Sequence, residues 1–185
     1  MGSDMDTQWP RYIVFQQDAP GAPYHYDGSV HAPDAELALL NARDVFTRRP
    51  DCIGLWVVRA DRLLARTAEE LAADPAWADQ PEMPGEKELY AVFQKRDHKG
   101  VHSSAGEVEA ASAEDALRRA LRTFPDEKVV VWWVCPSQAI TRSGREDLDA
   151  LFQMSDAPRF YREQDEFKTL TALRKAAGRG DDDGR

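Results

Sequence analysis

The sequence has few cysteines, a deficit of positive charge and no long apolar run. Its two cysteines, Cys52 and Cys135, are too few and too far apart for a disulfide framework or a thiolate metal site. With 24 Lys and Arg against 33 Asp and Glu, the net charge is -9 at pH 7, and such a chain repels a phosphate backbone. No apolar run approaches the roughly 18 residues that cross a bilayer, and residues 1–8 do not resemble a secretion signal. These absences argue against nucleic-acid-binding, membrane and secreted proteins, and they favour the reducing cytoplasm.

Motifs for catalysis are also scarce. His98 and His102 have the spacing of two metal ligands on a helix, but they fall in a glycine-flanked turn region with no acidic residue to complete the set. The phosphate-binding glycine loops and the Gly-x-Ser-x-Gly nucleophile motif are absent. Cys52 has no evident histidine partner, so we expect a buried thiol rather than a nucleophile. We therefore predict no catalytic, metal-binding or cofactor-binding residues, which argues against a stand-alone enzyme.

The sequence contains instead an internal duplication. Residues 11–17 match residues 89–95 at four of seven positions, and residues 28–46 match residues 106–124 at nine of nineteen. The nine identical pairs are Gly28/Gly106, Val30/Val108, Ala32/Ala110, Ala35/Ala113, Glu36/Glu114, Ala38/Ala116, Leu39/Leu117, Ala42/Ala120 and Phe46/Phe124. Such a repeat indicates that one supersecondary unit occurs twice. Most matched positions are apolar, so the packing face is retained while the polar face has diverged.

The first repeat is predicted to form strand, strand, helix, strand. The three expected strands are β-rich runs at residues 12–17, 25–31 and 53–59. Asp34 is the expected N-cap of the helix, which continues to about residue 48 before Pro50 ends it. The residues expected on its packing face are Ala38, Leu39, Ala42, Val45 and Phe46.

The second repeat follows the same plan. Its expected strands are residues 89–95, 101–110 and 129–135. Ser112 with Asp115 forms a capping-box pattern that begins a helix to Thr123. The sequence thus predicts an α+β fold of two tandem ββαβ repeats, with an antiparallel sheet and helices on one face, plus C-terminal helical segments.

Composition divides the chain into five segments. They are a first repeat at 9–73, an acidic, proline-rich linker at 74–86, a second, diverged repeat at 87–143, a C-terminal helical extension at 144–177 and a disordered Gly/Asp tail at 178–185. Within the first repeat we expect a helix at 61–73, and we expect the linker to be extended. The helices of the extension are expected at 144–154 and 162–177.

Tryptophans are the first candidates for an interaction surface. Trp56 and Trp133 occupy matched strand positions, and we expect both to pack against the helix of their repeat. Adjacent Trp132 and Trp133 point to opposite faces of the sheet, so one of them needs cover from the C-terminal helices or from another chain. Because tryptophan is enriched where proteins meet, Trp9 and Trp132 are candidate interface residues.

Arginines gather near the end of the first predicted helix. Arg48 and Arg49 follow Thr47, and Arg43 lies about one turn earlier. Cations in the last turn complement the helix dipole. Guanidinium groups also pair bidentately with carboxylates, so the same residues could contact an acidic partner. The spacing leaves both roles open.

The first repeat carries a longer and more specific pattern. It consists of Trp9-Pro10-x-Tyr12-x-Val14-Phe15, His25, Gly28-Ser29-x-His31-Ala32-x-Asp34, Asn41-Ala42-Arg43-Asp44-x-x-Thr47-Arg48-Arg49 and Trp56-Val57-Val58-x-Ala60. In these residues the sequence resembles the PaaB family, the small B subunits of phenylacetyl-CoA epoxidase (oxygenase) complexes of aerobic phenylacetate degradation. The close match covers residues 9–60, and the second repeat loses the Asn-Ala-Arg-Asp and Thr-Arg-Arg signatures. The chain is therefore similar to a fused, diverged pair of such subunits.

The resemblance implies a non-catalytic accessory subunit with no cofactor of its own. In such complexes a catalytic subunit holds a di-iron centre and binds phenylacetyl-CoA, a helical subunit is its inactive relative, and a reductase carries flavin and iron–sulfur groups. The accessory subunit is implied to bridge or organise the helical subunits and to help the reductase engage. The partner-interface candidates are Trp9, His25, His31, Asn41, Arg43, Asp44, Thr47, Arg48, Arg49 and Trp132. If single-repeat relatives act as dimers, this chain supplies both halves and is expected to be a monomeric pseudo-dimer.

A rival interpretation comes from another class of protein. Two similar halves can enclose a small ligand, and a cleft lined by His25, His31 and Tyr26 would make the chain a pseudo-symmetric sensor. Thermal stabilisation by phenylacetyl-CoA or phenylacetate, with no partner present, would favour the sensor.

Overall fold

The structure, a computed structural model that describes residues 8–47 and 52–144, contains two halves of the same design. The first half comprises β1 (Arg11–Gln17), β2 (His25–His31), α1 (Ala35–Phe46) and β3 (Gly54–Arg59). The second half comprises β5 (Glu88–Lys95), β6 (Ser103–Ala110), α3 (Ala113–Thr123) and β7 (Val131–Pro136). The predicted α+β fold with two ββαβ repeats is confirmed. The predicted C-terminal helices and tail lie outside the described residues.

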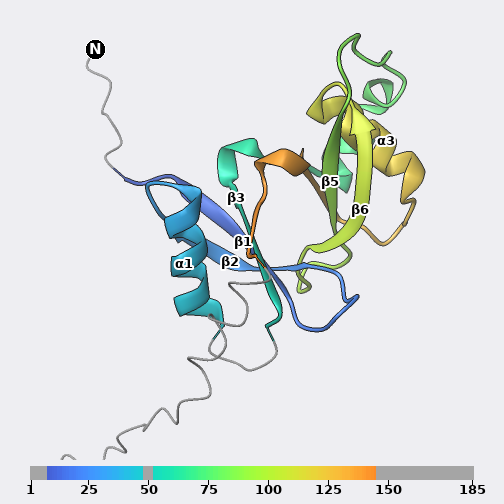
Figure 1. Ribbon diagram of the computed structural model, residues 1–185. Coiled ribbons are helices and arrows are strands. Elements are labelled where there is room, and N and C mark those ends of the chain that lie inside the picture. Colours follow the sequence, from blue (N-terminus) through green and yellow to red (C-terminus); the bar gives the residue numbers. More distant parts are fainter. Residues whose placement is uncertain (1–7, 48–51, 145–185) are drawn as a thin grey trace, which may run out of the picture.

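The strands form one antiparallel sheet of eight, in the order β4-β7-β5-β6-β2-β1-β3-β8. The halves meet at β2 and β6, where His25 pairs with Ser103 and the amide of Tyr26 donates to the carbonyl of His102 at 2.7 Å. Figure 1 shows α1 and α3 on opposite sides of the molecule, with the strands between them. The helix of each half therefore lies outermost.

Each helix begins at a side-chain cap and buries a stripe of small residues against its own half-sheet. The amide of Leu37 donates to the Asp34 carboxylate at 2.8 Å, which confirms the expected N-cap of α1. Ala38 and Ala42 are fully buried, whereas Val45 is 53% exposed, so its predicted place on the packing face was wrong. The longest helix in the described part of the chain, α1, has 12 residues, and no helix there is long and apolar enough to span a membrane.

The cap of α3 differs from the predicted capping box. Ser112 accepts from the amide of Asp115 at 3.2 Å, as an N-cap should. The Asp115 carboxylate, however, accepts a hydrogen bond from the Ser112 hydroxyl at 2.9 Å, whereas in a capping box it would accept from the backbone amide of Ser112. Asp115 is part of a buried hydrogen-bond network on the outer face of α3. Helix α3 thus starts where the sequence predicts, with a different partner for its acidic residue.

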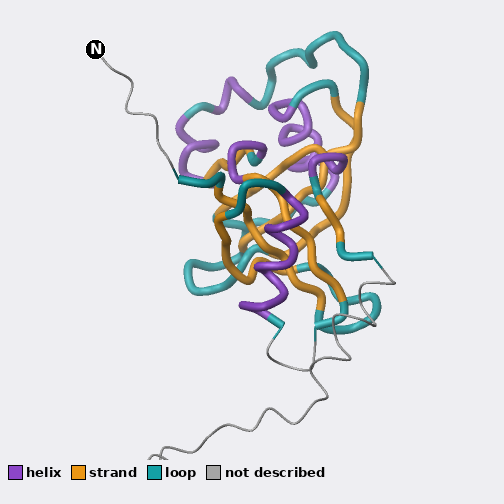
Figure 2. The backbone as a smooth tube through the Cα atoms, turned by 60° about the vertical axis from the view of Figure 1, so that its left-hand side comes forward, coloured by secondary structure: helices purple, strands orange, loops and turns teal. Residues whose placement is uncertain are grey.

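One apolar cluster lies beneath each of α1 and α3. A third cluster joins the two halves through the sheet faces that carry no helix. The ring of Phe15 stacks on that of Phe93, with centroids 4.0 Å apart and planes at 13°. The buried residues of this cluster are Ile13, Phe15, Val58, Ala91, Phe93, Cys135 and Ile140. Both halves therefore have two apolar faces, one covered by a helix and the other by the opposite half. Figure 2 shows the backbone from a second direction, with the helices outside the strands.

Trp56 of β3 and Trp133 of β7 belong to this inner face. Trp56 stacks on Tyr24 at 3.6 Å and Trp133 stacks on His102 at 3.5 Å, so the prediction that both pack against the helices was wrong. The neighbouring Trp132 is the one that packs with the core beneath α3. Trp133 is covered in part by Phe15 and Tyr26 of the first half.

The repeated Gly–Phe pairs explain two of the identities in the duplicated sequence. A Cβ at Gly28 would lie 2.6 Å from the ring of Phe46, and a Cβ at Gly106 would lie 2.6 Å from the ring of Phe124. A register shift occurs beside each glycine, between Val14 and Phe15 and between Val92 and Phe93. Gly106 also has a φ of 146°, which side chains rarely adopt. Close approach of the helix end to the strand thus requires glycine in both halves.

The segment after β3 departs most from prediction. In place of a helix at 61–73, a 3₁₀ turn (Ala60–Arg62) leads to β4 (Leu64–Thr67) and a short helix, α2 (Ala68–Ala73). Strand β4 pairs with β7 of the second half, while β8 (Thr141–Arg142) pairs with β3 of the first. The halves therefore exchange edge strands. A four-residue strand that gains its partner from a distant segment leaves no periodic signal in the sequence.

Replacing Phe93 with alanine is expected to lower the free energy of unfolding by about 3–5 kcal/mol, because a fully buried ring is lost from the contact between the halves. The matched control is Leu89→Ala on the same strand, whose side chain is 47% exposed and which should cost only about 0.5 kcal/mol. Urea unfolding followed by tryptophan fluorescence measures both. Equal losses would contradict a core shared by the two halves.

Candidate functional site

The outer face of α1 is the most unusual surface in the described part of the chain. Since Ala38 and Ala42 turn toward the sheet, Leu37 and Leu40, one turn apart, lie on the outer side of the helix, and Val45 follows near its C-terminal end. These side chains are 43%, 45% and 53% exposed. Leu37 and Leu40 are neighbours on the helix and form an exposed aliphatic patch of the kind that binds another protein segment.

Five of the predicted interface residues gather on or beside this helix. The Asn41 amide donates to the carbonyl of His31 at 3.3 Å, which ties the middle of α1 to the end of β2. Toward the helix end, the Thr47 hydroxyl donates to the carbonyl of Arg43 at 2.6 Å, and the Arg43 guanidinium pairs with Asp44 at 2.9 Å. Arg48 and Arg49 lie outside the described residues.

The other three candidates are scattered. Trp9 is 60% exposed and precedes β1, where the neighbouring Pro10 carbonyl accepts from the amide of Ala32. His25 lies at the far end of β2 from His31, with its Nδ1 3.8 Å from the Asp18 carboxylate. Trp132 is only 3% exposed, so it contributes to the core and not to the surface of the chain. The periodicity of a strand identifies opposite faces but not which face a helix covers.

On α3 the corresponding outer face is covered by the linker. Arg119 donates two hydrogen bonds to the Glu82 carboxylate, at 3.0 and 2.7 Å, and these lower the pKa of Glu82 and raise that of Arg119. The Arg118 guanidinium lies 5.1 Å from the centre of the Trp77 ring. The linker is thus bound to α3. The sequence signal for this contact is the acidic composition of the linker together with the arginines of α3.

Beneath the linker lies a buried ion pair between Asp115 and Arg118, which are 1% and 4% exposed. The Asp115 carboxylate also accepts from the amide of Met83 at 3.0 Å. Burial alone would raise the pKa of Asp115, but hydrogen bonds from Arg118, the Met83 amide and Ser112 hold it below its usual value. Asp115 therefore stays ionised and fixes the linker on the helix.

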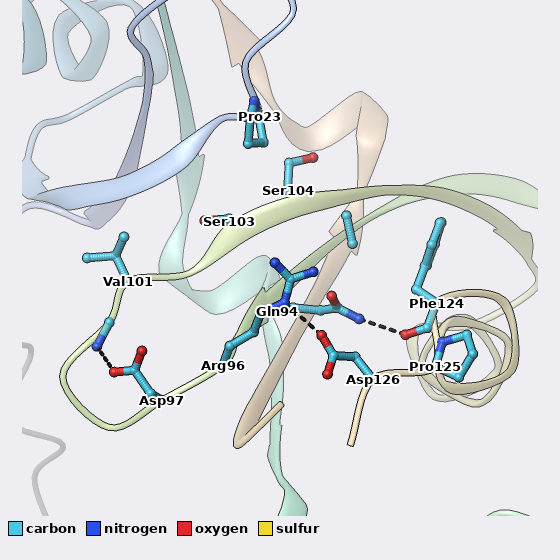
Figure 3. A pocket seen from close by; sticks show the side chains of 12 residues that line it. Pro23, Gln94, Arg96, Asp97, Val101, Ser103, Ser104, Phe124, Pro125 and Asp126 are labelled. Carbon is cyan, nitrogen blue, oxygen red and sulfur yellow. Dashed lines mark hydrogen bonds and ion pairs between the residues drawn. The ribbon is translucent and has the colours of Figure 1, made fainter. Parts of the chain in front are cut away.

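A groove of about 620 Å³ lies between the β5–β6 turn and the end of α3 (Figure 3). Its charged groups are already engaged with one another or with the backbone. Arg96 pairs with Asp126 at 2.8 Å, and Gln94 donates to the carbonyl of Phe124 at 2.8 Å. The Asp97 carboxylate accepts from the amide of Lys99 at 2.8 Å. None of the predicted interface residues lines this groove.

The geometry needed for the rival sensor is not formed. His25 and His31 lie at opposite ends of β2, and Tyr26 packs edge-on against Trp133 with ring centroids 5.5 Å apart. The space between the halves is filled by the cluster around Phe15 and Phe93. The predicted cleft lined by His25, His31 and Tyr26 was therefore wrong. A pocket of about 370 Å³ that residues of both halves line contains none of these three residues.

The groups most often used for metal binding and nucleophilic attack are dispersed or buried. No three or more His, Cys, Asp or Glu side chains are grouped to hold a metal ion within residues 8–47 and 52–144. Burial raises the pKa of Cys52 to about 11 and that of Cys135 to about 12. Both thiols therefore remain protonated near neutral pH and are poor nucleophiles.

His102 is a buried histidine whose Nε2 has no hydrogen-bond partner among the described residues. Its ring is sandwiched at the junction of the halves, stacked on Trp133 and edge-on to Tyr26. Burial, with a smaller contribution from the charge of Lys95, lowers its pKa to about 4. The imidazole is therefore neutral near pH 7, and charging it opposes the folded state.

Two comparisons with known proteins match this chain. A family model described as phenylacetic acid degradation B (PaaB) matches residues 8–80 and again residues 86–174. The B subunit of the 1,2-phenylacetyl-CoA epoxidase of Escherichia coli (strain K12) is 43% identical over 73 residues, which are 38% of this chain and 77% of that relative. No solved structure matches the chain.

Acid is expected to destabilise the protein through His102. Its pKa falls from 6.5 when unfolded to about 4 when folded, so stability is intact above about pH 6.5 and falls as the pH drops toward 4. Between about pH 7.5 and 5 the loss should be about 2 kcal/mol. Urea unfolding at both pH values measures it. The control, His102→Phe, retains a stacked ring but cannot titrate, and an undiminished loss in this variant would refute the assignment.

Proposed function

Because the chain belongs to the PaaB (phenylacetic acid degradation B) family, we propose that it is an accessory subunit of a phenylacetyl-CoA epoxidase. The observation that carries the proposal is the tandem family match, at residues 8–80 and 86–174, on a chain whose halves share one core. The chain supplies two PaaB-type units in one polypeptide. Its role is to bridge or organise the catalytic subunit and that subunit's helical relative, and to help the reductase engage.

The arrangement of its side chains supports an organising role. The described cysteines are buried and protonated, and five of the ten residues singled out from the sequence gather on or beside an outer helix rather than in a pocket. In this proposal the di-iron centre belongs to the partner catalytic subunit, and flavin and iron–sulfur groups belong to the partner reductase. The chain contributes binding surface to the complex and no cofactor.

The C-terminal end of α1 is the proposed contact with the helical subunits. The Arg43 side chain is 27% exposed, and its ion-pair partner Asp44 is 69% exposed, so the pair contributes little to the stability of the chain itself. The corresponding position of α3 is Leu121, so this charge is specific to the first half. With Arg48 and Arg49 nearby in the sequence, Arg43 would pair with carboxylates of the partner.

The first experiment is affinity capture with the tagged chain from phenylacetate-grown cells of its source, with the proteins identified by mass spectrometry. Recovery of a di-iron oxygenase subunit together with its helical relative is the expected result. A clean preparation of the chain alone, from a lysate that contains both subunits, would overturn the proposal.

Replacing Arg43 with leucine, the residue at the matching position of α3, is expected to weaken binding of the helical subunits about 10-fold, through loss of a charged contact. The melting temperature should not change. The matched control is Arg96→Leu, which removes an exposed arginine that is also paired with a carboxylate, from the second half. Titration of the purified partners by calorimetry measures both, and equal affinities would exclude Arg43 from the interface.

The free chain is expected to be a monomer, because each half already covers the inner face of the other. Light scattering coupled to size exclusion should therefore give a mass near 20.8 kDa. A stable dimer would show that the chain does not complete its own pseudo-dimer.

A further inference from the structure

The outer faces of the two helices differ in what covers them. On α3, Asp115 and Arg118 are 1% and 4% exposed beneath the linker. The matching residues of α1, Leu37 and Leu40, are 43% and 45% exposed within the described part of the chain. Among the residues that the structure describes, the more apolar of the two equivalent faces is thus the one that no other segment covers.

The chain follows the same course after β7 as it does after β3, where that course leads the linker onto α3. After β3, the 3₁₀ turn and β4 carry the chain onto β7 of the opposite half, and α2 and the linker then cross α3. After β7, a 3₁₀ turn (Ser137–Ala139) and β8 carry the chain onto β3, where the amide of Ser143 donates to the carbonyl of Leu55 at 2.8 Å. Strand β8 also contacts α1. Residue 144 therefore lies beside the first half, at the point equivalent to the start of α2.

The next residues resemble the segment that covers α3. Residues 145–160 correspond to residues 68–83 when the 3₁₀ turns are matched. The identical pairs are Glu69/Glu146, Leu71/Leu148, Ala73/Ala150, Asp79/Asp156 and Pro81/Pro158. The positions that contact the outer face of α3 are the ones that change, with Met154 in place of Trp77, Arg159 in place of Glu82 and Phe160 in place of Met83.

These changes mirror those on α1. Glu82 pairs with Arg119 at 2.7 Å and lies 4.0 Å from Arg122. On α1 the position of Arg119 is occupied by the neutral Asn41 and that of Arg122 by Asp44, and in residues 145–160 the position of Glu82 is occupied by Arg159. The charges of the Arg122–Glu82 pair are thus reversed on both sides. The polarity of the side chains also changes on both sides of the contact, as the next pair of positions shows.

The cation–π contact of Arg118 with Trp77 is replaced by two apolar residues, Leu40 and Met154. From these paired changes we propose that residues 145–160 bind the outer face of α1 in the same chain, with Met154 against Leu40 and Arg159 beside Asp44. The occupant is the chain's own segment, since both sides of the contact have changed together. The proposal is independent of the epoxidase assignment.

A disulfide trap in the full chain tests this contact. Leu40→Cys with Met154→Cys is expected to form an intrachain disulfide about 10-fold faster than the control pair, Leu89→Cys with Met154→Cys, because contact raises the local concentration of the thiols. Leu89 is a matched control because it is 47% exposed on β5. The native thiols are fully buried and do not compete. An interchain disulfide would place the segment on another copy, and equal rates would leave the face open; either result overturns the proposal.

A second variant tests the same contact without cysteine chemistry. Lysine has nearly the helix propensity of leucine, so Leu40→Lys is neutral on an open face. On a covered face it should lower the melting temperature of the full chain by about 5 °C. Met154→Lys should do the same, and the double variant should lose less than the sum of the two. Unchanged melting temperatures, as expected for Leu89→Lys, would overturn the proposal.

Discussion

The stacked rings of Phe15 and Phe93 are the contact on which the rest of the structure depends. Their strands are apolar on both faces, and a helix covers only one face of each half-sheet. The second face of each half is covered by the other half, with the two rings 4.0 Å apart at its centre. Because burial of apolar area is the main source of stability, neither half has a satisfied core alone. Duplication within one chain meets this requirement without a second molecule.

Closure of the inner faces also determines where interactions with other molecules can occur. With both inner faces filled, the outward sides of α1 and α3 are the surfaces left to diverge. The helices keep their alanine stripes and their contacts with Gly28 and Gly106, whereas their outer residues differ in charge and polarity. Packing thus restrains one side of each helix and leaves the other side free to acquire function.

Local patterns in the sequence predict the elements that depend on local interactions. The strand alternation, the caps at Asp34 and Ser112 and the repeat itself all follow from residues close in the chain. The side of the sheet on which Trp56, Trp132 and Trp133 lie does not, because alternation separates two faces without saying what covers each. Strand β4 and the linker over α3 were missed for the same reason, since their partners are more than 30 residues away. The candidates on α1 gather because helical spacing alone places them together.

The difference between the halves bears on why a fused pair is useful. Two identical copies related by a two-fold axis must present the same outer surface twice. In this chain the pseudo-symmetric core is retained, while the outer face of α3 is polar and binds the linker through Glu82 and Asp115. The first half keeps Arg43 and Asp44 at the surface, where the second half has Leu121 and Arg122. Fusion therefore allows the outer surfaces of the two halves to differ while both halves keep the same core.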